Sequence, residues 1–302
     1  MKMAGLRTCL LALGALLGSI PGAALQAQSV SAAPIELVQE TVQNEINSNS
    51  SAKFMFRQRE ETSRGSQTKL IVETKDIAAG MLVAIDDKPL SPEERQNEQV
   101  RLENLVNNPQ ELRKKEKAEK EDTERTNRIM RALPEAFLFQ ADGVQTGTKE
   151  MGSPGDELLR IEFRPNPDYN PPSHTEQVLT GMAGYMLIDR REHRIAKIDG
   201  TLEKEVGFGW GILGRLNKGG RFVVQQGTMG TGAWQVTRMD LDLTGKILFF
   251  KKLAFKSSQT FSDFREAPPN LSFAQGVELL KKQAQELAEN HSQAPATDQN
   301  RK

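Results

Sequence analysis

The chain has 302 residues, of which 37% are hydrophobic and 26% are charged, with 40 basic and 40 acidic side chains. This length suffices for one large β-domain or two ordinary domains. The zero formal charge excludes a general electrostatic attraction to nucleic acid or to an anionic membrane. The single cysteine, Cys9, lies in a segment that we expect to be removed, so no disulfide and no thiol chemistry is expected.

The first 27 residues are typical of a secretory signal peptide. Lys2 and Arg7 precede an apolar run over Cys9–Ile20, which is too short to span a bilayer. Small residues follow, and we expect cleavage after Ala27. No second apolar run approaches the length of a membrane helix. The sequence therefore predicts a periplasmic or secreted protein that is soluble once the signal peptide is removed.

The segment that follows predicts a helix and then strands. Apolar residues recur at steps of three and four over Ala33–Asn47, which indicates an amphipathic helix. Lys53–Glu60 predicts a strand with Phe54 and Phe56 on one face. Two further strands are expected over Lys69–Thr74 and Met81–Asp86.

Two capped helices are predicted next, over 91–133. Ser91-Pro-Glu-Glu94 is a capping box, and Asn108-Pro109 starts a second helix that should stop before Pro134. From Glu111 to Arg128, 13 of 18 residues are charged, with both signs mixed. Such a run is typical of a solvated helix. The pair is therefore either a solvent-facing helical hairpin inserted between strands or a docking arm for a partner protein.

The second half of the chain predicts an antiparallel meander over Gly184–Phe261. Short turns rich in Gly, Asp and Asn separate its strands, and a change of apolar face near Thr237-Arg238 predicts a β-bulge. A stiff proline-rich loop over 164–173 either crosses a sheet end or shapes a binding rim. The predicted strands of this half are Glu135–Gln140, Leu158–Arg164, Tyr185–Asp189, Arg194–Leu202, Arg221–Gln226, Ala233–Leu243 and Lys246–Phe255, the last two separated by a turn at Thr244-Gly245.

These elements predict an α+β fold, a curved antiparallel sheet or half-barrel with covering helices. We expect one domain over 33–265, with the helical hairpin 91–133 inserted in it. A final helix is expected over 266–289, starting at Ser272. Residues 290–302 are polar without an apolar period, which predicts a disordered tail.

No motif in the chain specifies a catalytic site. The letters of a dinucleotide fingerprint occur at Gly209-Trp-Gly211-Ile-Leu-Gly214, but no helix can form before the turn at Asn217. The histidines have no ligand spacing, and a Gly-x-Ser-x-Gly elbow is missing from the sequence. We therefore expect neither an enzyme nor a bound metal or cofactor. A hydrolase with a carboxylate pair remains an alternative, since 40 acidic residues offer no way to select two.

The aromatic residues favour apolar contents over sugar or nucleic acid, because Phe dominates at 13 against two Trp and two Tyr. The 246–255 strand is apolar on both faces and so needs cover on both sides. Either the N-terminal helix and the sheet close into a packed core, or a cavity between them holds a lipid-like ligand. The candidate ligand-binding residues are Trp210, Trp234, Phe249, Phe250 and Phe255.

The order of elements resembles the outer-membrane lipoprotein-sorting (LolA/LolB-like) superfamily. The resemblance covers about Ile35–Arg265 and is strongest over Gly184–Asp189, Arg194–Ile198 and Lys246–Arg265. It implies a half-closed antiparallel barrel whose concave side is plugged by helices. The strings DKPLSPEE and GFGWGILGRLNKGG also resemble secreted bacterial proteins.

From these observations we expect a non-enzymatic periplasmic protein that binds a lipid or acyl chain in the half-barrel. The alternative is an interaction module of the cell envelope that captures a partner protein through the charged helical hairpin 91–133.

Overall fold

The computed structural model describes residues 34–48, 52–209, 213–230, 232–247 and 251–293, all within one unit, Ala32–Lys302. The predicted signal peptide over 1–27 and the last nine residues, 294–302, lie outside the described residues. The rest of the predicted tail, 290–293, is helical, because the final helix extends to Gln293.

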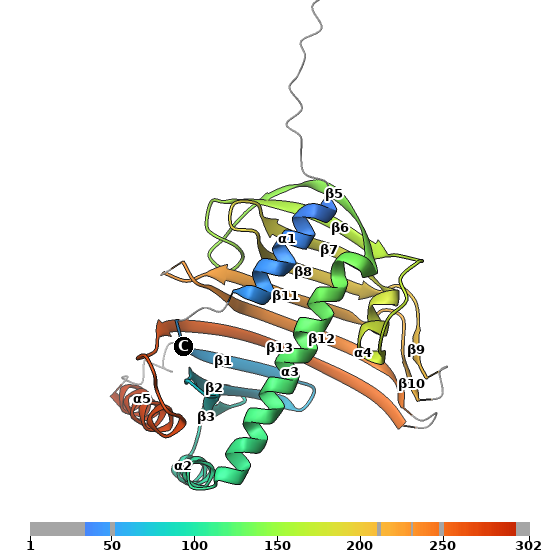
Figure 1. Ribbon diagram of the computed structural model, residues 1–302. Coiled ribbons are helices and arrows are strands. Elements are labelled where there is room, and N and C mark those ends of the chain that lie inside the picture. The colour runs from blue at the N-terminus through green and yellow to red at the C-terminus, as the bar shows by residue number, and fades with distance from the viewer. Residues whose placement is uncertain (1–33, 49–51, 210–212, 231, 248–250, 294–302) are drawn as a thin grey trace, which may run out of the picture. The chain divides into compact units, whose positions relative to one another are not determined.

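The described chain folds into five α-helices, a short 3-10 helix and thirteen strands (Figure 1). The helices are α1 (Pro34–Asn47), α2 (Pro92–Val106), α3 (Pro109–Ala136), α4 (His174–Gln177), the 3-10 helix η1 (Val178–Gly181) and α5 (Phe273–Gln293). The strands are β1 (Phe54–Thr62), β2 (Gly65–Glu73), β3 (Ala78–Ile85), β4 (Lys88–Pro89), β5 (Phe137–Thr146), β6 (Glu157–Pro165), β7 (Met182–Asp189), β8 (Arg194–Leu202), β9 (Val206–Phe208), β10 (Gly214–Leu216), β11 (Arg221–Thr228), β12 (Trp234–Ile247) and β13 (Lys251–Glu266).

All named strands belong to one open sheet, which confirms the predicted α+β fold class. Its order is β4-β3-β2-β1-β13-β12-β11-β8-β7-β6-β5, with antiparallel pairing throughout and with β9 and β10 off this path. The last strand, β13, pairs with the first, β1, along its length. Because β13 also pairs with β12, it joins the N-terminal hairpins to the meander that follows.

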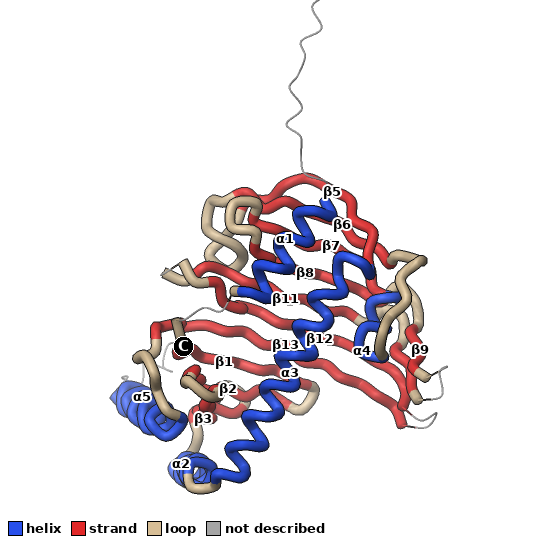
Figure 2. The backbone as a smooth tube through the Cα atoms, viewed as in Figure 1, coloured by secondary structure: helices blue, strands red, loops and turns tan. Residues whose placement is uncertain are grey.

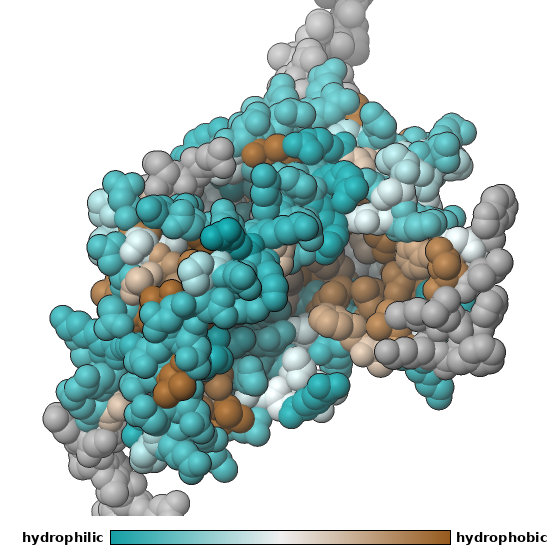
Figure 3. All heavy atoms as spheres, turned by 60° about the horizontal axis from the view of Figure 1, so that its bottom comes forward, coloured by the Kyte–Doolittle hydropathy of each residue, from teal (hydrophilic) through white to brown (hydrophobic). Residues whose placement is uncertain are grey.

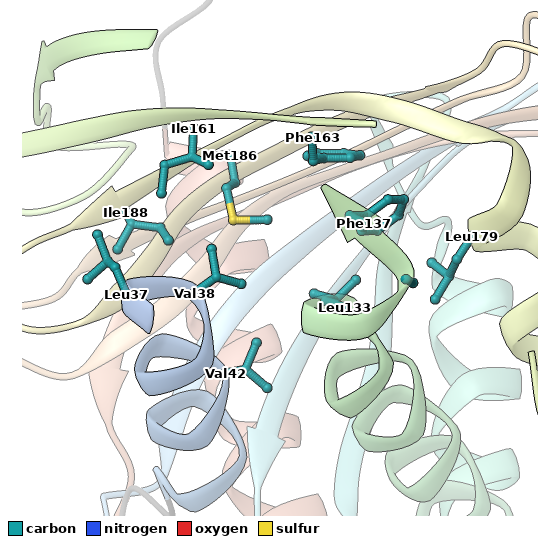
Figure 4. Close-up of a cluster of buried hydrophobic side chains, with 11 residues drawn as sticks. Leu37, Val38, Val42, Leu133, Phe137, Ile161, Phe163, Leu179, Met186 and Ile188 are labelled. Atoms are coloured by element: carbon teal, nitrogen blue, oxygen red, sulfur yellow. The ribbon is translucent and has the colours of Figure 1, made fainter. Parts of the chain in front are cut away.

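The concave face of β5–β8 is covered by α1 and by the C-terminal end of α3 (Figures 1 and 2). Leu37, Val38 and Val42 of α1 contact the buried side chains of Ile161, Met186 and Ile188 (Figure 4). These positions recur at helical spacing on α1 and alternate along the strands, as an amphipathic helix on a half-buried sheet requires. The structure thereby confirms the N-terminal helix predicted over Ala33–Asn47.

On the opposite face of the sheet, the described helices cover β2 and β3. There α5 packs Phe273, Val277 and Leu280 against Leu70 and Val72, and α2 adds Leu102. Leu70 and Ile71 are consecutive in β2, so their side chains point to opposite faces of the sheet. The strand pairing places Ile71 on the face that α1 covers, and Leu70 therefore lies on the other face. The sheet therefore has helical cover on opposite faces at its two ends.

Side chains of α2 and α3 form hydrogen bonds with backbone groups on the outer edge of β3. Glu98 accepts a hydrogen bond from the amide of Leu82 at 2.8 Å, and Glu119 accepts one from the amide of Ala78 at 3.3 Å. Arg101 donates to the carbonyl oxygen of Gly80 at 3.0 Å. Alternate residues of a strand point their amides and carbonyls to the same edge, so these side chains replace a missing neighbouring strand.

Helix α3 then runs from this edge to the other edge of the sheet, where it continues into β5. From Glu119 to Ala136 the helix rises about 26 Å. Nine inter-strand spacings separate β3 from β5, and they measure about 43 Å along the sheet. An arc of about 43 Å on a chord of about 26 Å is roughly half a circle of radius about 13 Å. The sheet is therefore a half-barrel, and α3 spans its open side.

The sequence predicts that α3 stops before Pro134, and this prediction is wrong, because the helix continues to Ala136. Proline removes the hydrogen bond to the carbonyl four residues earlier, but only two residues of the helix follow it. Asn166 of the proline-rich loop satisfies the final carbonyls. Its amide donates to Ala136 O at 2.8 Å and its side chain donates to Glu135 O at 2.9 Å.

The predicted turn at Thr244-Gly245 is also wrong, because β12 continues through it to Ile247 and pairs with β13 up to Lys251. Gly245 lies opposite β10, and a Cβ atom at this position would come within 2.2 Å of the carbonyl oxygen of Arg215. The glycine therefore permits close strand approach and does not make a turn. The predicted bulge is confirmed, because the pairing of β11 with β12 skips Thr237.

A buried carboxylate attaches α1 to the sheet. Glu45 accepts two hydrogen bonds from Arg194 at 3.0 Å and one from the amide of Ile195 at 2.8 Å. The side chains of Glu45 and Arg194 are only 11% and 16% exposed. Removing one member of such a pair leaves an uncompensated charge in the interior.

We expect Glu45→Gln to lower the free energy of unfolding by about 3 kcal/mol, since it unpairs Arg194. Urea denaturation followed by circular dichroism measures this change. Glu36→Gln is the matched control, because Glu36 is an exposed carboxylate on the same helix. Equal stability of the two variants would show that the pair does not hold α1 in place.

Candidate functional site

The central strands of the half-barrel carry apolar side chains on the concave face that none of the described helices buries. We call this surface the trough. Pairing places Val224 beside Met239 and Phe222 beside Leu241, on the face that α1 covers farther along the sheet. The partly or largely exposed apolar residues of the trough are Phe56, Phe222, Val224, Met239, Leu241, Phe255, Phe261 and Phe264.

Neither covering helix buries the trough. In the described part of the chain, the core cluster beneath α1 and α3 extends along the sheet only as far as Ile198 of β8. Between Arg113 and Arg128, α3 has only three side chains that are even partly buried, those of Lys115, Glu119 and Asn127. The middle of α3 therefore crosses the sheet without an apolar contact surface. A view from below shows a hollow in which hydrophobic side chains gather (Figure 3).

An aromatic cluster forms one end of the trough. The ring of Phe56 lies 6.0 Å from Phe261 and 5.3 Å from Phe264, centroid to centroid. Phe264 also contacts Phe54, at 6.4 Å. The pairing of β1 with β13 is irregular between Met55 and Arg57, and this bulge brings Phe264 to the same face as Phe261.

A polar cluster lies in the floor of the trough between this aromatic end and Phe255. Glu60 accepts hydrogen bonds from Ser257 Oγ at 3.0 Å and from Gln259 Nε2 at 3.3 Å. Gln58 Nε2 donates to Gln259 Oε1 at 2.9 Å. Both bonds to Glu60 reach its Oε1 atom. Within the described residues Oε2 has no hydrogen-bond donor, so the floor offers an acceptor to a ligand group with an N–H or O–H.

The structure describes two of the five predicted site residues, Trp234 and Phe255, and places them far apart. Trp210, Phe249 and Phe250 lie outside the described residues. Trp234 is buried against Leu158 and Leu187, and its indole donates to Glu192 at 2.7 Å. Phe255 is 49% exposed and lies opposite Leu243, which is about 30 Å along β12 from Trp234.

Of the two described candidates, only Phe255 therefore lines the trough. The aromatic cluster and the polar floor were missed as site residues, although the alternation of Phe54 and Phe56 along the first strand was a visible signal. Their partners come from β13, about 200 residues away in the chain, and sequence spacing does not reveal that pairing.

The face of the sheet opposite the trough carries ion pairs. Arg221 donates to both oxygens of Asp199, and Lys197 Nζ lies 3.1 Å from Asp199 Oδ2. Burial by itself raises the pKa of Asp199, but the hydrogen bonds from Arg221 and Lys197 outweigh it and hold the pKa below its ordinary value. These charges are mutually satisfied and describe a structural network.

Among the described residues, no three metal-ligating side chains gather into a group, and no helix has the length and apolarity needed to cross a membrane. The chain matches no protein-family model, and no curated protein matches it.

The trough should be open to a thiol reagent. In a chain whose cysteine Cys9 is replaced by Ser, we expect Met239→Cys to react with a maleimide about tenfold faster or more than Met186→Cys. Both positions are on the concave face, but Met186 is buried beneath α1 and Met239 is not. Mass spectrometry over time measures the rates. Equal rates would show that the trough is closed in solution.

Replacement of Asp199 should change how stability depends on pH. Because its folded pKa is lowered, Asp199 stabilises the protein above its unfolded pKa of about 4, and this contribution is lost as the pH falls below that value. Asp199→Asn should therefore lower the free energy of unfolding at pH 7 by about 1–3 kcal/mol. It should also make the further decrease of that free energy at acid pH smaller than in the wild type. Urea denaturation at several pH values measures both. An unchanged acid slope would contradict this assignment.

Proposed function

We propose that the protein is a non-enzymatic carrier of a lipid or acyl chain, held in the trough of the half-barrel. The observation that carries this proposal is the row of partly exposed apolar side chains on the concave face of β1, β13, β12 and β11. Soluble proteins rarely leave contiguous apolar surface uncovered unless it contacts a ligand or a partner. A concave, mainly apolar surface with a few polar groups is typical of a ligand site.

The shape of the trough supports an elongated ligand. Apolar residues follow β13 from Leu253 and Phe255 to Phe261, interrupted only by the polar cluster at Ser257 and Gln259. An acyl chain could lie along this line, with a donor group of its head at Glu60. Burial of each methylene contributes about 0.8 kcal/mol, so a chain of several carbons suffices for binding.

The charged surface of α3 favours the carrier function over the alternative, in which this helix docks a partner protein. Many of its charges pair with one another, as in Lys114–Glu111 and Arg125–Asp122 at 2.7 and 2.8 Å. A helix whose charges pair internally is solvated and lacks the apolar anchors of a hot spot. Together with the predicted signal peptide, this favours a carrier in the periplasm, similar to the lipoprotein-sorting proteins that the sequence resembles.

Binding to the trough should depend on Phe255. We expect Phe255→Glu to abolish binding of a fluorescent long-chain acyl probe, because a charge in the floor must be desolvated by the chain. Ala254→Glu is the matched control, since Ala254 is the exposed neighbour on the opposite face of β13. Fluorescence titration measures both affinities, and circular dichroism verifies folding.

Two results would contradict the proposal. One is equal probe binding by the two variants. The other is the absence of any lipid when the wild-type protein is purified from its own cell envelope without detergent and extracted for mass spectrometry.

A further inference from the structure

A cavity lies on the face of the sheet opposite the trough, between β13, β1, β2 and β3 and the C-terminal half of α5. It has a volume of about 690 Å³ and is bounded on one side by α2. That size is within the range of about 300–1,000 Å³ that is typical of small-molecule sites. We call it the α5 cavity. Arg57 and Arg59 line it, and they alternate along β1 with Gln58 and Glu60 of the trough floor.

One end of the α5 cavity is polar and offers hydrogen-bond donors. Arg57, Thr260 and Ser262 are neighbours across β1 and β13 and all line the cavity. Arg57 Nε lies 3.1 Å from Asp263 Oδ2, but the angle is outside that of a hydrogen bond, so Nε is a buried donor without an acceptor. The terminal nitrogens of Arg57 have no hydrogen bond within the described residues.

The neighbouring arginine is different, because carboxylates already occupy its donors. Arg59 donates from Nε and Nη2 to Asp87 at 2.7 and 2.8 Å, and from Nη1 to Glu61 at 2.9 Å. Asp87 belongs to the β3–β4 turn, where its backbone has a φ of 58°. Although Arg57 is ion-paired with Asp263 through Nε, its terminal nitrogens are the guanidinium donors left for a ligand. Arg95, which donates Nη1 to the carbonyl oxygen of Leu90 at 2.8 Å, lines the α2 side of the same cavity.

The α5 cavity also has an apolar part, beside Gln285 and Glu289 of α5, which form a hydrogen bond with each other at 2.9 Å. Met81 and Val83 of β3 form its floor, and Leu90 and Leu287 approach from the β4 loop and from α5. A ligand complementary to both ends needs an anionic head with acceptor oxygens and a short apolar tail. Guanidinium groups bind carboxylate and phosphate through charge-assisted hydrogen bonds, which are stronger than neutral ones.

We propose that the α5 cavity binds a small anionic amphiphile, with its carboxylate or phosphate head at Arg57, Thr260 and Ser262 and its tail along Met81 and Val83. This site is independent of the trough, because it lies on the other face of β1 and β13. The protein thus has two ligand sites of different chemistry on the two faces of the same strands.

Titration calorimetry tests the proposal in the Phe255→Glu background, which blocks the trough. The probes are decanoate, decyl phosphate, decanol and decyltrimethylammonium, each below its micelle concentration. We expect one or both anions to bind about tenfold more tightly, or better, than the neutral and cationic probes. Whichever anion binds more tightly identifies the head group. Equal binding of all four probes, or binding of none, would overturn the proposal.

Two variants locate the site. Arg57→Gln should weaken anion binding by about tenfold or more, whereas Arg64→Gln, an exposed arginine of the β1–β2 turn outside the cavity, should not. Val83→Phe should fill the apolar end and shift the preference from decanoate toward hexanoate. Circular dichroism verifies that each variant is folded. Unchanged affinity in Arg57→Gln, with an unchanged chain-length preference in Val83→Phe, would place the anion elsewhere.

Discussion

The half-barrel depends on one geometric constraint, the attachment of α3 to both edges of the sheet. At one edge Glu119 bonds β3, and at the other the helix continues directly into β5. The helix is shorter than the arc of strands between these points, so the sheet has to curve. With α3 across a half circle, its axis lies about 13 Å from the central strands, beyond the roughly 10 Å at which packed layers lie. Because α3 lies farther from the central strands than packed layers do, the space between them stays open as the trough.

Strand β1 contributes side chains to both candidate sites, because its alternate residues point to opposite faces of the sheet. Its even-numbered residues Phe56, Gln58 and Glu60 belong to the trough, and its odd-numbered residues Arg57 and Arg59 belong to the α5 cavity. The helices cover opposite faces at the two ends of the sheet, α1 over β5–β8 and α5 over β2 and β3. The strands between them have incomplete helical cover on both faces. The trough lies on these strands, and the α5 cavity extends from β1 and β13 to β2 and β3 beneath α5.

Local signals in the sequence predicted the elements well. The capping box at Ser91, the cap at Asn108 and the bulge at Thr237 are all present in the structure. These features depend on a few neighbouring residues, whose chemistry decides the local backbone. The errors at Pro134 and Gly245 have the opposite origin. Asn166 and β10 supply the deciding contacts from distant parts of the chain, and single-sequence patterns carry no record of them.

The polarity of α3 explains why the trough does not close into a packed core. An apolar inner face on this helix would gain free energy by contacting Met239 and Leu241, and the sheet would collapse onto it. The partly buried positions in the middle of α3 are instead polar: Lys115 and Glu119, which pair with each other at 2.7 Å, and Asn127. Desolvating that pair against the trough would cost more than weak ion pairing returns. The charged composition of α3, conspicuous in the sequence, therefore acts by keeping the concave face available.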